Sequence, residues 1–155
     1  MVDAEPSAFT GPLEDRVEIR ELMDTHAHGV MTRDPQLWGS IWAEDAFWDL
    51  PEYPDLGGFT GRAAIVEAWS ASMERYGLDK MAKPMVYFMQ PGSILIEGNR
   101  AKTVAYTHEL YEHPDTGELI RAHGRYDDEA EKRDGRWYFT RRAYRIVHED
   151  RRPAD

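Results

Sequence analysis

The second half of the sequence consists of long segments in which small or apolar residues alternate with polar ones, and this pattern restricts the fold most strongly. An alternation with a period of two is typical of β-strands that have one covered face and one face in water. The pattern predicts two short strands around Pro91-Gly92 and long strands at residues 101–113, 118–133 and 134–149. Short turns are expected between them, at residues 97–100, 114–117 and 133–135. Strands connected by short turns pair in an antiparallel sheet.

The first half of the sequence is mainly helical in character. Residues 13–31 place most of their apolar side chains at the spacing of one helix face. A second, short helix is predicted at residues 33–45, followed by a short strand at residues 46–50 and a loop at residues 51–61. A third helix is expected to begin after Thr60, its cap, and to end at Gly77. Helices followed by a run of antiparallel strands indicate an α+β fold.

One face of the predicted sheet is lined by small residues. Alternate positions on two neighbouring strands hold Ala101, Thr103, Ala105, Thr107, Ala122 and Gly124. Small side chains beneath a helical layer leave room for a cavity, and the sheet must bend strongly to enclose it. We expect β-bulges near Pro91-Gly92 and Gly124 to supply that bend. The predicted architecture is a strongly bent, mostly antiparallel sheet with three covering helices that enclose one pocket.

Composition restricts the partners and the compartment. The chain has 155 residues, a net charge of −10 and no cysteine. The acidic charge disfavours nucleic acid and anionic membranes as partners, and the lack of cysteine excludes disulfides and thiolate metal sites. No apolar run is long enough to cross a membrane, and no basic signal segment begins the sequence. We therefore expect a cytoplasmic protein that binds neither nucleic acid nor a membrane.

The length of the chain and its breaker residues indicate a single domain. Residues 1–12 are small and acidic and are interrupted by prolines and a glycine, while the last residues are polar. No repeat, low-complexity tract or linker lies between these ends. We expect a flexible N-terminal arm at residues 1–12, one domain at residues 13–149 and a flexible tail at residues 150–155.

Two histidines stand two positions apart in the first predicted helix. His26 lies on the apolar stripe, four residues from both Leu22 and Val30, whereas His28 lies on the polar side. Side chains two positions apart on a helix point in different directions, so the pair is not expected to share a metal ion. We expect His26 to face inward and His28 to face outward.

Four residues could together support proton transfer. His26, Glu109, Tyr126 and Arg142 supply an acid or base, a carboxylate, a phenol and a fixed cation, which suits proton abstraction with anion stabilisation. Each residue also has a purely structural explanation, as a core histidine, an ion-paired glutamate, a packed tyrosine or a strand arginine. A carboxylate on the covered face, at Glu109 or Asp128, must be paired, hydrogen-bonded or protonated. Sequence motifs for nucleotide, acyl-serine or zinc chemistry are absent, and we expect no cofactor and no metal.

Two segments of the sequence resemble the SnoaL-like branch of the nuclear-transport-factor-2-like superfamily. They are "IRELM…RDPQLWGSIWAEDAFWD", within residues 19–49, and "GRYDDEAEKRDGRWYFTRR", residues 124–142. The resemblance extends from about Arg16 to Glu149 and includes the group of hexachlorocyclohexane dehydrochlorinases and scytalone dehydratases. It implies a cone-shaped α+β barrel around one pocket. It also implies a cofactor-free lyase, isomerase or cyclase that acts on hydrophobic, often cyclic molecules and forms dimers or trimers through the outer face of its sheet.

The resemblance also assigns positions in the pocket. The Asp/His dyad typical of the dehydrochlorinases falls on Met31 and Val86, so both members are missing. A helical lysine of that group falls on His26, its pocket tryptophan on Trp48 and its late-strand arginine on Arg142. Its remaining pocket positions fall on Thr107, Glu109, Ala122 and Tyr126. The residues that we expect to contact a substrate are Val30, Met31, Trp48, Val86, Thr107, Ala122 and Asp128.

The expected function is that of a cofactor-independent lyase. We expect dehydration or retro-aldol cleavage of a C–C bond, by proton abstraction from a hydrophobic aromatic or polycyclic small molecule. In this hypothesis His26 moves the proton, Glu109 orients it or acts as partner base, and Tyr126 and Arg142 stabilise an oxyanion. The alternatives are a non-catalytic small-ligand-binding or accessory protein and an isomerase or cyclase with the same fold.

The outer face of the predicted sheet is unusually apolar for an acidic protein of this size. Val104, Tyr106, His108 and Leu110 lie on it, and we expect Trp137 and Phe139 to extend the patch. Such a surface favours a homo-oligomer, with a dimer expected and a trimer as the alternative.

Overall fold

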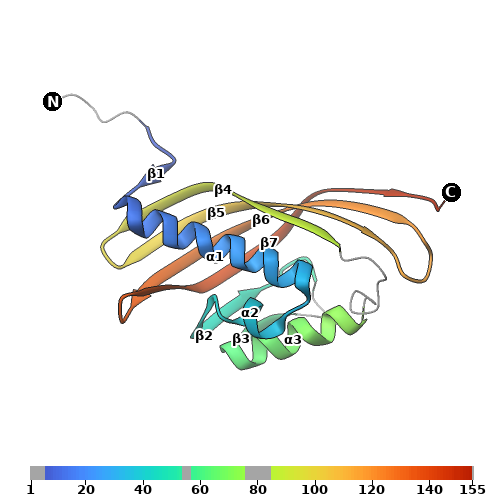
Figure 1. The fold of residues 1–155 in the computed structure, drawn as a ribbon, viewed down its shortest axis with the longest axis horizontal. Helices are drawn as coiled ribbons and strands as arrows, with labels where there is room; N and C mark the ends of the chain where they lie inside the picture. The colour runs from blue at the N-terminus through green and yellow to red at the C-terminus, as the bar shows by residue number, and fades with distance from the viewer. Residues whose placement is uncertain (1–5, 54–56, 76–84, 155) are drawn as a thin grey trace.

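The fold combines helices and a single sheet. The computed structural model describes residues 6–53, 57–75 and 85–154. Its elements are β1 (Phe9–Thr10), α1 (Leu13–Thr32), α2 (Pro35–Gly39), β2 (Trp42–Asp49), β3 (Gly58–Thr60), α3 (Arg62–Arg75), β4 (Val86–Glu97), β5 (Arg100–Glu112), β6 (Leu119–Arg133) and β7 (Arg136–Arg152). Figure 1 shows α1 lying along the sheet, with α2 and α3 close to the C-terminal end of α1. The α+β class predicted from the sequence is therefore confirmed.

The strands form one mixed sheet in the order β1-β4-β5-β6-β7-β2-β3. The β2–β3, β4–β5, β5–β6 and β6–β7 pairs are antiparallel, whereas β1–β4 and β2–β7 are parallel. Within the described residues β1 and β3 are the edges of the sheet, so it is an open, cone-like sheet and not a closed barrel. The prediction of a mostly antiparallel sheet covered by three helices is confirmed.

Irregular pairing bends the sheet at the predicted places. The β4–β5 register shifts between Pro91 and Ser93, and the β6–β7 register shifts between His123 and Gly124. A further shift, not anticipated from the sequence, lies between Glu129 and Ala130. Because an extra residue on one strand kinks that strand and increases its twist, these bulges curve the sheet around the space beneath the helices.

Two predicted elements have different bounds in the structure. The second helix ends at Gly39, and Trp42 belongs to β2, where it pairs with Phe139 of β7. Asp34 starts this short helix by accepting hydrogen bonds from the backbone of Gln36 and Leu37. The two short strands expected around Pro91 are one continuous strand, β4, because the bulge accommodates a residue that cannot donate a backbone hydrogen bond.

The third helix starts close to the predicted cap. Thr60 is the last residue of β3, and the carbonyl oxygen of Gly61 accepts the hydrogen bond from the backbone N–H of Ile65. The predicted end of the helix at Gly77 lies outside the described residues.

The sheet includes residues on both sides of the predicted 13–149 domain. Phe9 and Thr10, in the segment expected to be a flexible arm, pair with Ile94 and Leu95 of β4. At the other end β7 continues to Arg152, inside the predicted tail. Pairing with the long neighbouring strands β4 and β6 holds these short segments in place.

The core lies between α1 and the inner face of the sheet. His26 is buried and His28 is exposed, as predicted from the helix pattern. Trp137 and Phe139 are fully buried, so the prediction that they belong to the outer patch is wrong. The reason is the bulge beside Ala130, which changes the alternation along β7. Before the bulge, odd-numbered residues such as Phe139 face inward, and after it even-numbered residues such as Arg142 do so.

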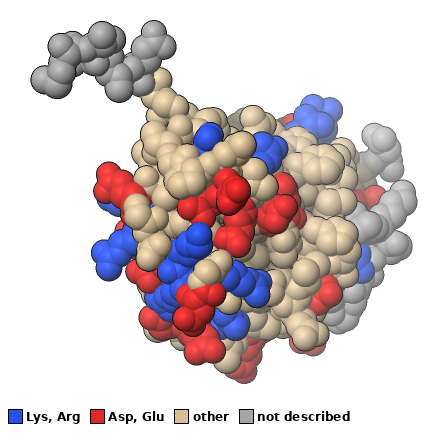
Figure 2. Space-filling view, turned by 60° about the vertical axis from the view of Figure 1, so that its left-hand side comes forward, with Lys and Arg blue, Asp and Glu red and all other residues tan. Residues whose placement is uncertain are grey.

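Charged side chains of both signs share the surface. On the face shown in Figure 2, acidic and basic side chains lie close together, and neither sign covers the whole face. Within the described residues, no helix is both long and apolar enough to span a bilayer.

The outer face of the sheet retains an exposed apolar patch. Phe88 and Tyr106 are 60% and 45% exposed, and Val104, His108 and Leu110 are partly exposed beside them. Exposed aromatic side chains at the centre of a sheet face favour burial against another chain. Homo-oligomerisation through this face stays a prediction.

Light scattering at micromolar concentration tests this prediction. We expect a mass of at least twice the 17.9 kDa of one chain. The double variant Tyr106→Glu, Leu110→Lys should reduce the mass to that of one chain, because it places charges in the patch. The control variant Leu13→Glu changes an exposed apolar residue on α1 and should keep the wild-type mass. A wild-type mass near 17.9 kDa would overturn the prediction.

Candidate active site

A cavity of about 390 Å³ lies between the three helices and the inner face of the sheet. Its wall receives His26 and Val30 from α1, Trp38 from α2, Trp48 from β2 and Trp69 from α3. The sheet contributes Tyr87, Glu109, Tyr111, Ile120, Tyr126 and Tyr144. The exposed residues Glu149 and Arg151 also line it, so the cavity reaches the surface at the end of β7.

The wall of the cavity is predominantly aromatic. Trp38 stacks on Trp69 with ring centroids 4.7 Å apart, and it contacts Trp48 edge-on at 5.4 Å. The indole N–H groups of Trp38 and Trp48 are buried. That of Trp38 has no acceptor among the described residues, whereas that of Trp48 lies near the Tyr126 hydroxyl. Gly29 allows α2 to approach α1, because a β-carbon at this position would clash with the Cβ atom of Trp38 and lie tight against its backbone. An apolar, aromatic wall of this kind suits a hydrophobic cyclic ligand.

His26 is held at the inner end of the cavity by aromatic rings and by one arginine. Its ring stacks on Tyr87 at 5.4 Å and meets Tyr126 edge-on at 5.4 Å. Its Nδ1 atom lies 2.8 Å from Nη1 of Arg142. A guanidinium group can only donate, so Nδ1 must be the acceptor and carries no proton. His26 is therefore neutral with its proton on Nε2, and burial together with the Arg142 charge holds its pKa well below the usual range.

Arg142 lies behind the wall of the cavity. Its Nε and Nη2 atoms each donate to one carboxylate oxygen of Asp128, both at 2.9 Å. The guanidinium is fully buried between the rings of Tyr126 and Phe139, with its central carbon 4.1 and 4.0 Å from their centroids. Burial lowers the pKa of Arg142, but Asp128 together with Tyr126 and Tyr87 raises it by more, so the group stays charged. Arg142 thus contacts His26 and is not one of the residues that line the cavity.

Glu109 contributes a carboxyl group to the wall of the cavity. Its Oε2 atom accepts hydrogen bonds from the Tyr144 hydroxyl at 2.5 Å and from the Thr107 hydroxyl at 3.2 Å. Thr107 is oriented in turn by the backbone N–H of Gly124, which donates to its Oγ1 at 2.9 Å. The other carboxylate oxygen, Oε1, has no hydrogen-bond partner among the described residues and remains available to a ligand.

The surroundings of Glu109 favour its protonated form. Burial raises the pKa of Glu109 above its ordinary value, although the hydrogen bonds from Tyr144 and Thr107 oppose this shift. Burial also raises the pKa values of Tyr126 and Tyr144, and the Glu109 charge adds to both shifts. The phenols therefore stay protonated near neutral pH, and the raised pKa of the Glu109 carboxyl group is a shift toward the range in which general bases work.

The structure brings together only part of the residue set expected from the sequence. His26, Glu109, Tyr126, Val30 and Trp48 line the cavity. The other six, which are not lining residues, are Arg142, Met31, Val86, Thr107, Ala122 and Asp128. Thr107 and Asp128 instead support the wall, by holding Glu109 and Arg142 respectively.

Two important residues were not anticipated from the sequence. Tyr144 binds Glu109, and Tyr87 stacks on His26. For Tyr144 a signal was available, because it is two positions from Arg142 on the same strand and so shares its face. Tyr87 similarly alternates with the exposed Phe88 on β4. Alternation along the strand does not show that the Tyr144 hydroxyl contacts Glu109 or that the Tyr87 ring contacts His26.

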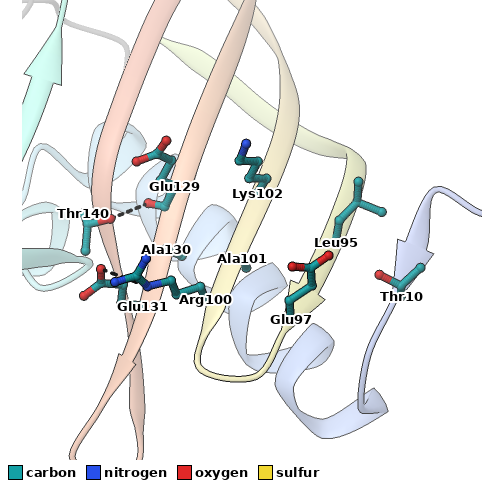
Figure 3. A pocket seen from close by; sticks show the side chains of 10 residues that line it. All are labelled: Thr10, Leu95, Glu97, Arg100, Ala101, Lys102, Glu129, Ala130, Glu131 and Thr140. Atoms are coloured by element: carbon teal, nitrogen blue, oxygen red, sulfur yellow. Dashed lines mark hydrogen bonds and ion pairs between the residues drawn. The ribbon is translucent and has the colours of Figure 1, made fainter.

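A larger hollow lies on the opposite face of the sheet. It has a volume of about 560 Å³, and half of its ten lining residues are charged, including Glu97, Arg100, Lys102 and Glu129. Figure 3 shows these side chains on neighbouring strands, with Arg100 directed toward Glu131. The exposed charges on this open sheet face are screened by water. Because the lining residues include no buried proton-transfer group, this hollow is not the candidate active site.

Replacing Gly124 tests how closely Tyr144 and Thr107, the two residues that donate to Glu109, are packed. A β-carbon at this position would collide with the ring of Tyr144 and with Oγ1 of Thr107. We expect Gly124→Ala to lower the free energy of unfolding by about 1–3 kcal/mol, the usual cost of overpacking. Urea unfolding followed by circular dichroism gives the measurement, and unchanged stability would show that Tyr144 and Thr107 are not packed as described.

The burial of neutral His26 predicts a pH-dependent stability. The unfolded chain binds a proton on this histidine below about pH 6.5, but the folded chain does not, because its pKa is lowered. The free energy of unfolding should therefore fall as the pH drops below about 6.5, by up to about 1.4 kcal/mol per pH unit from this group. Urea unfolding between pH 5 and 8 should show a smaller slope for His26→Gln. His28→Gln, on the exposed side of the same helix, should keep the wild-type slope, and an unchanged slope in His26→Gln would be inconsistent with a buried neutral ring.

Solved structures share this fold. A hexachlorocyclohexane dehydrochlorinase of type 2 superposes with a TM-score of 0.75 at 19% identity, covering 92% of this chain and 92% of the other. A protein from Novosphingobium aromaticivorans with the proposed name aromatic ring hydroxylase gives 0.73 at 24% identity, covering 94% and 96%. A proposed scytalone dehydratase from the same species gives 0.73 at 20% identity, covering 92% and 93%. At these identities the likeness shows a common fold.

The sequence comparison identifies the family. No curated protein matches the chain in sequence. The family described as "SnoaL-like domain" matches residues 11–143, a span that contains both helix α1 and most of the sheet. Because this match covers well over half of the chain, the protein belongs to the SnoaL-like domain family.

Proposed function

We propose that this protein is a cofactor-independent lyase that removes a proton from a hydrophobic aromatic or polycyclic small molecule. The observation that carries the proposal is Glu109, a carboxyl group with raised pKa and one free oxygen in an aromatic cavity. A base of this kind abstracts a proton best when its pKa lies near the working pH. The dehydrochlorinase and dehydratase names among proteins with this fold are consistent with a lyase.

Glu109 is a better candidate base than His26, which reverses the roles expected from the sequence. The Nδ1 atom of His26 already accepts from Arg142, and Nε2 carries the proton of the neutral ring. To accept a further proton, His26 would have to break its contact with a buried cation. Glu109 needs no such change, because its Oε1 atom is free of partners within the described chain.

Two reactions suit this arrangement. In dehydration, Glu109 removes a proton from the carbon beside a carbonyl group, the C–H electrons form the new double bond, and the β-hydroxyl leaves with that proton as water. In retro-aldol cleavage, Glu109 takes the proton of a β-hydroxyl group, the C–C bond breaks and the enolate fragment is reprotonated at carbon. Both reactions conserve atoms and electrons and need only one base together with donors for the oxyanion.

The alternative function is ligand binding without turnover. A purely binding pocket has no need of ionisable groups with free atoms, and its His26 and Glu109 would be closed in pairs. Here each residue uses one atom for support and leaves the other without a partner in the described structure. This feature favours an enzyme over a binding protein.

Deuterium exchange tests the role of Glu109 without knowledge of the natural substrate. The wild-type protein in D₂O should accelerate exchange of the C2 protons of 1-tetralone, and it should convert 3-hydroxy-1-tetralone to fluorescent 1-naphthol. Glu109→Gln should lower both rates by roughly 10²–10⁴-fold, the usual contribution of a general base. NMR and fluorescence give the two rates.

The control is Glu112→Gln, which removes an exposed carboxylate from the same strand and should leave both rates unchanged. Tyr144→Phe should shift the acid limb of the pH–rate profile upward, because the Tyr144 hydrogen bond lowers the pKa of Glu109. Full activity in Glu109→Gln would exclude it as the base. Lack of exchange by a folded wild-type protein would favour the binding function.

A further inference from the structure

The inner end of the cavity presents hydrogen-bond donors that have no acceptor. His26 carries its proton on Nε2, and this N–H has no partner among the described residues although the ring lines the cavity. Tyr126, whose ring centroid lies 5.4 Å from that of His26, adds a protonated hydroxyl to the same wall. The buried Trp48 indole N–H lies near the Tyr126 hydroxyl oxygen, so the Tyr126 O–H is the donor that this pair offers to a ligand.

Unpaired donors in a buried wall favour a ligand that has a hydrogen-bond acceptor. Leaving a buried N–H without an acceptor costs about 1–3 kcal/mol, so a ligand that supplies an acceptor is favoured over one that does not. A carboxylate ligand would place a second negative charge close to Glu109, whereas a carbonyl oxygen accepts hydrogen bonds without a charge. The aromatic wall around these donors fits the ring system that would carry such a carbonyl group.

Arg142 fixes the His26 ring in the tautomer that carries its proton on Nε2. Two hydrogen bonds to Asp128 hold its guanidinium in place, and a third group of the same side chain donates to Nδ1 of His26. Because Nδ1 is always an acceptor, the ring cannot rearrange to present a bare Nε2 to the cavity. Arg142 and Asp128 are therefore positioning residues that act on a ligand only through His26.

We propose that the inner end of the cavity is a carbonyl site, in which His26 Nε2–H, assisted by the Tyr126 hydroxyl, donates to the oxygen of an aromatic or polycyclic ketone. This inference rests on the proposed function and specifies its substrate class. When Glu109 takes the proton from the carbon beside the carbonyl, the electron pair moves into the C–C bond and the oxygen becomes an enolate. His26 then stabilises that oxygen without giving up its proton. Hydrocarbons and haloalkanes, which offer no such acceptor, are poor ligands of this site.

The tautomer of His26 can be measured directly in the unmodified protein. In ¹⁵N-histidine-labelled protein, two-bond ¹H–¹⁵N NMR spectra distinguish a neutral ring with its proton on Nε2 from the other tautomer and from the cation. We expect the Nε2–H pattern from pH 6 to 8, with the His26 signals assigned by their loss in His26→Gln. A proton on Nδ1, or a cationic ring at pH 7, would overturn the proposal.

Ligand binding tests whether the site prefers a ketone to the corresponding hydrocarbon. 1-Tetralone and tetralin have the same fused rings, but only 1-tetralone has the carbonyl oxygen. Tryptophan fluorescence titration of the wild-type protein should give a dissociation constant about 3- to 10-fold lower for 1-tetralone, the effect of one net hydrogen bond. His26→Leu should remove this preference. His26→Gln, whose amide can donate from a similar position, should retain part of it.

The outcomes separate this proposal from the proposed function. Glu109→Gln should keep the preference for 1-tetralone while losing deuterium exchange, because it removes the base and leaves the donors. Equal binding of the two ligands by wild type, or no binding of 1-tetralone, would overturn the carbonyl site even if Glu109-dependent exchange persisted. A preserved preference in a folded His26→Leu protein would assign the donor to another residue and would also overturn it.

Discussion

The buried guanidinium of Arg142, in contact with Asp128 and His26, determines how the candidate site is arranged. An uncompensated buried charge costs several kcal/mol, so the guanidinium must keep partners that lie on β6 and α1. This requirement fixes α1 against the sheet at the point where His26 enters the cavity. It also decides the chemistry of the histidine, since a ring that accepts from an arginine must present its N–H on the other side. The charged Arg142 side chain thus orients the neutral His26 ring so that its Nε2–H points into the cavity.

The bulges of the sheet determine which side chains reach this cluster. The register shift beside Ala130 allows both Phe139 and Arg142 to face inward, although the spacing between them should place them on opposite faces. The shift beside Gly124 brings a residue without a side chain under the ring of Tyr144, and Tyr144 can then reach Glu109. The first bulge therefore brings Arg142 to His26, and the second allows Tyr144 to reach Glu109.

Much of the fold could be predicted from the sequence, because it follows from local patterns. The period of alternate residues identified the long strands, the helix stripe separated His26 from His28, and Pro91-Gly92 and Gly124 marked two of the bulges. The inward positions of Trp137 and Phe139 were missed because alternation cannot be followed through a bulge that no glycine or proline marks. The helix expected at Trp42 was wrong because pairing with β7 outweighs local helical spacing there.

The candidate site could be predicted only as a set of residues. His26, Glu109 and Tyr126 were expected in one pocket, because each lies on a covered face, and all three line the cavity. Their roles depend on which atom contacts which partner, and spacing in the sequence carries no such information. Arg142, expected to bind an oxyanion, instead uses its donors on Asp128 and His26. Tyr144 shares the face of Arg142, but alternation along β7 does not show that its hydroxyl donates to Glu109.

Titration of the Glu109 carboxyl carbon shows whether this group can exchange protons with a ligand. In protein labelled with ¹³C at the glutamate side-chain carboxyl carbon, the Glu109 signal can be assigned by comparison with Glu109→Gln and followed by NMR from pH 3 to 9. Because burial raises its pKa, the signal should titrate above the range of the exposed glutamates. A Glu109 signal that titrates with the exposed glutamates or below them would rule out the role of Glu109 as the base.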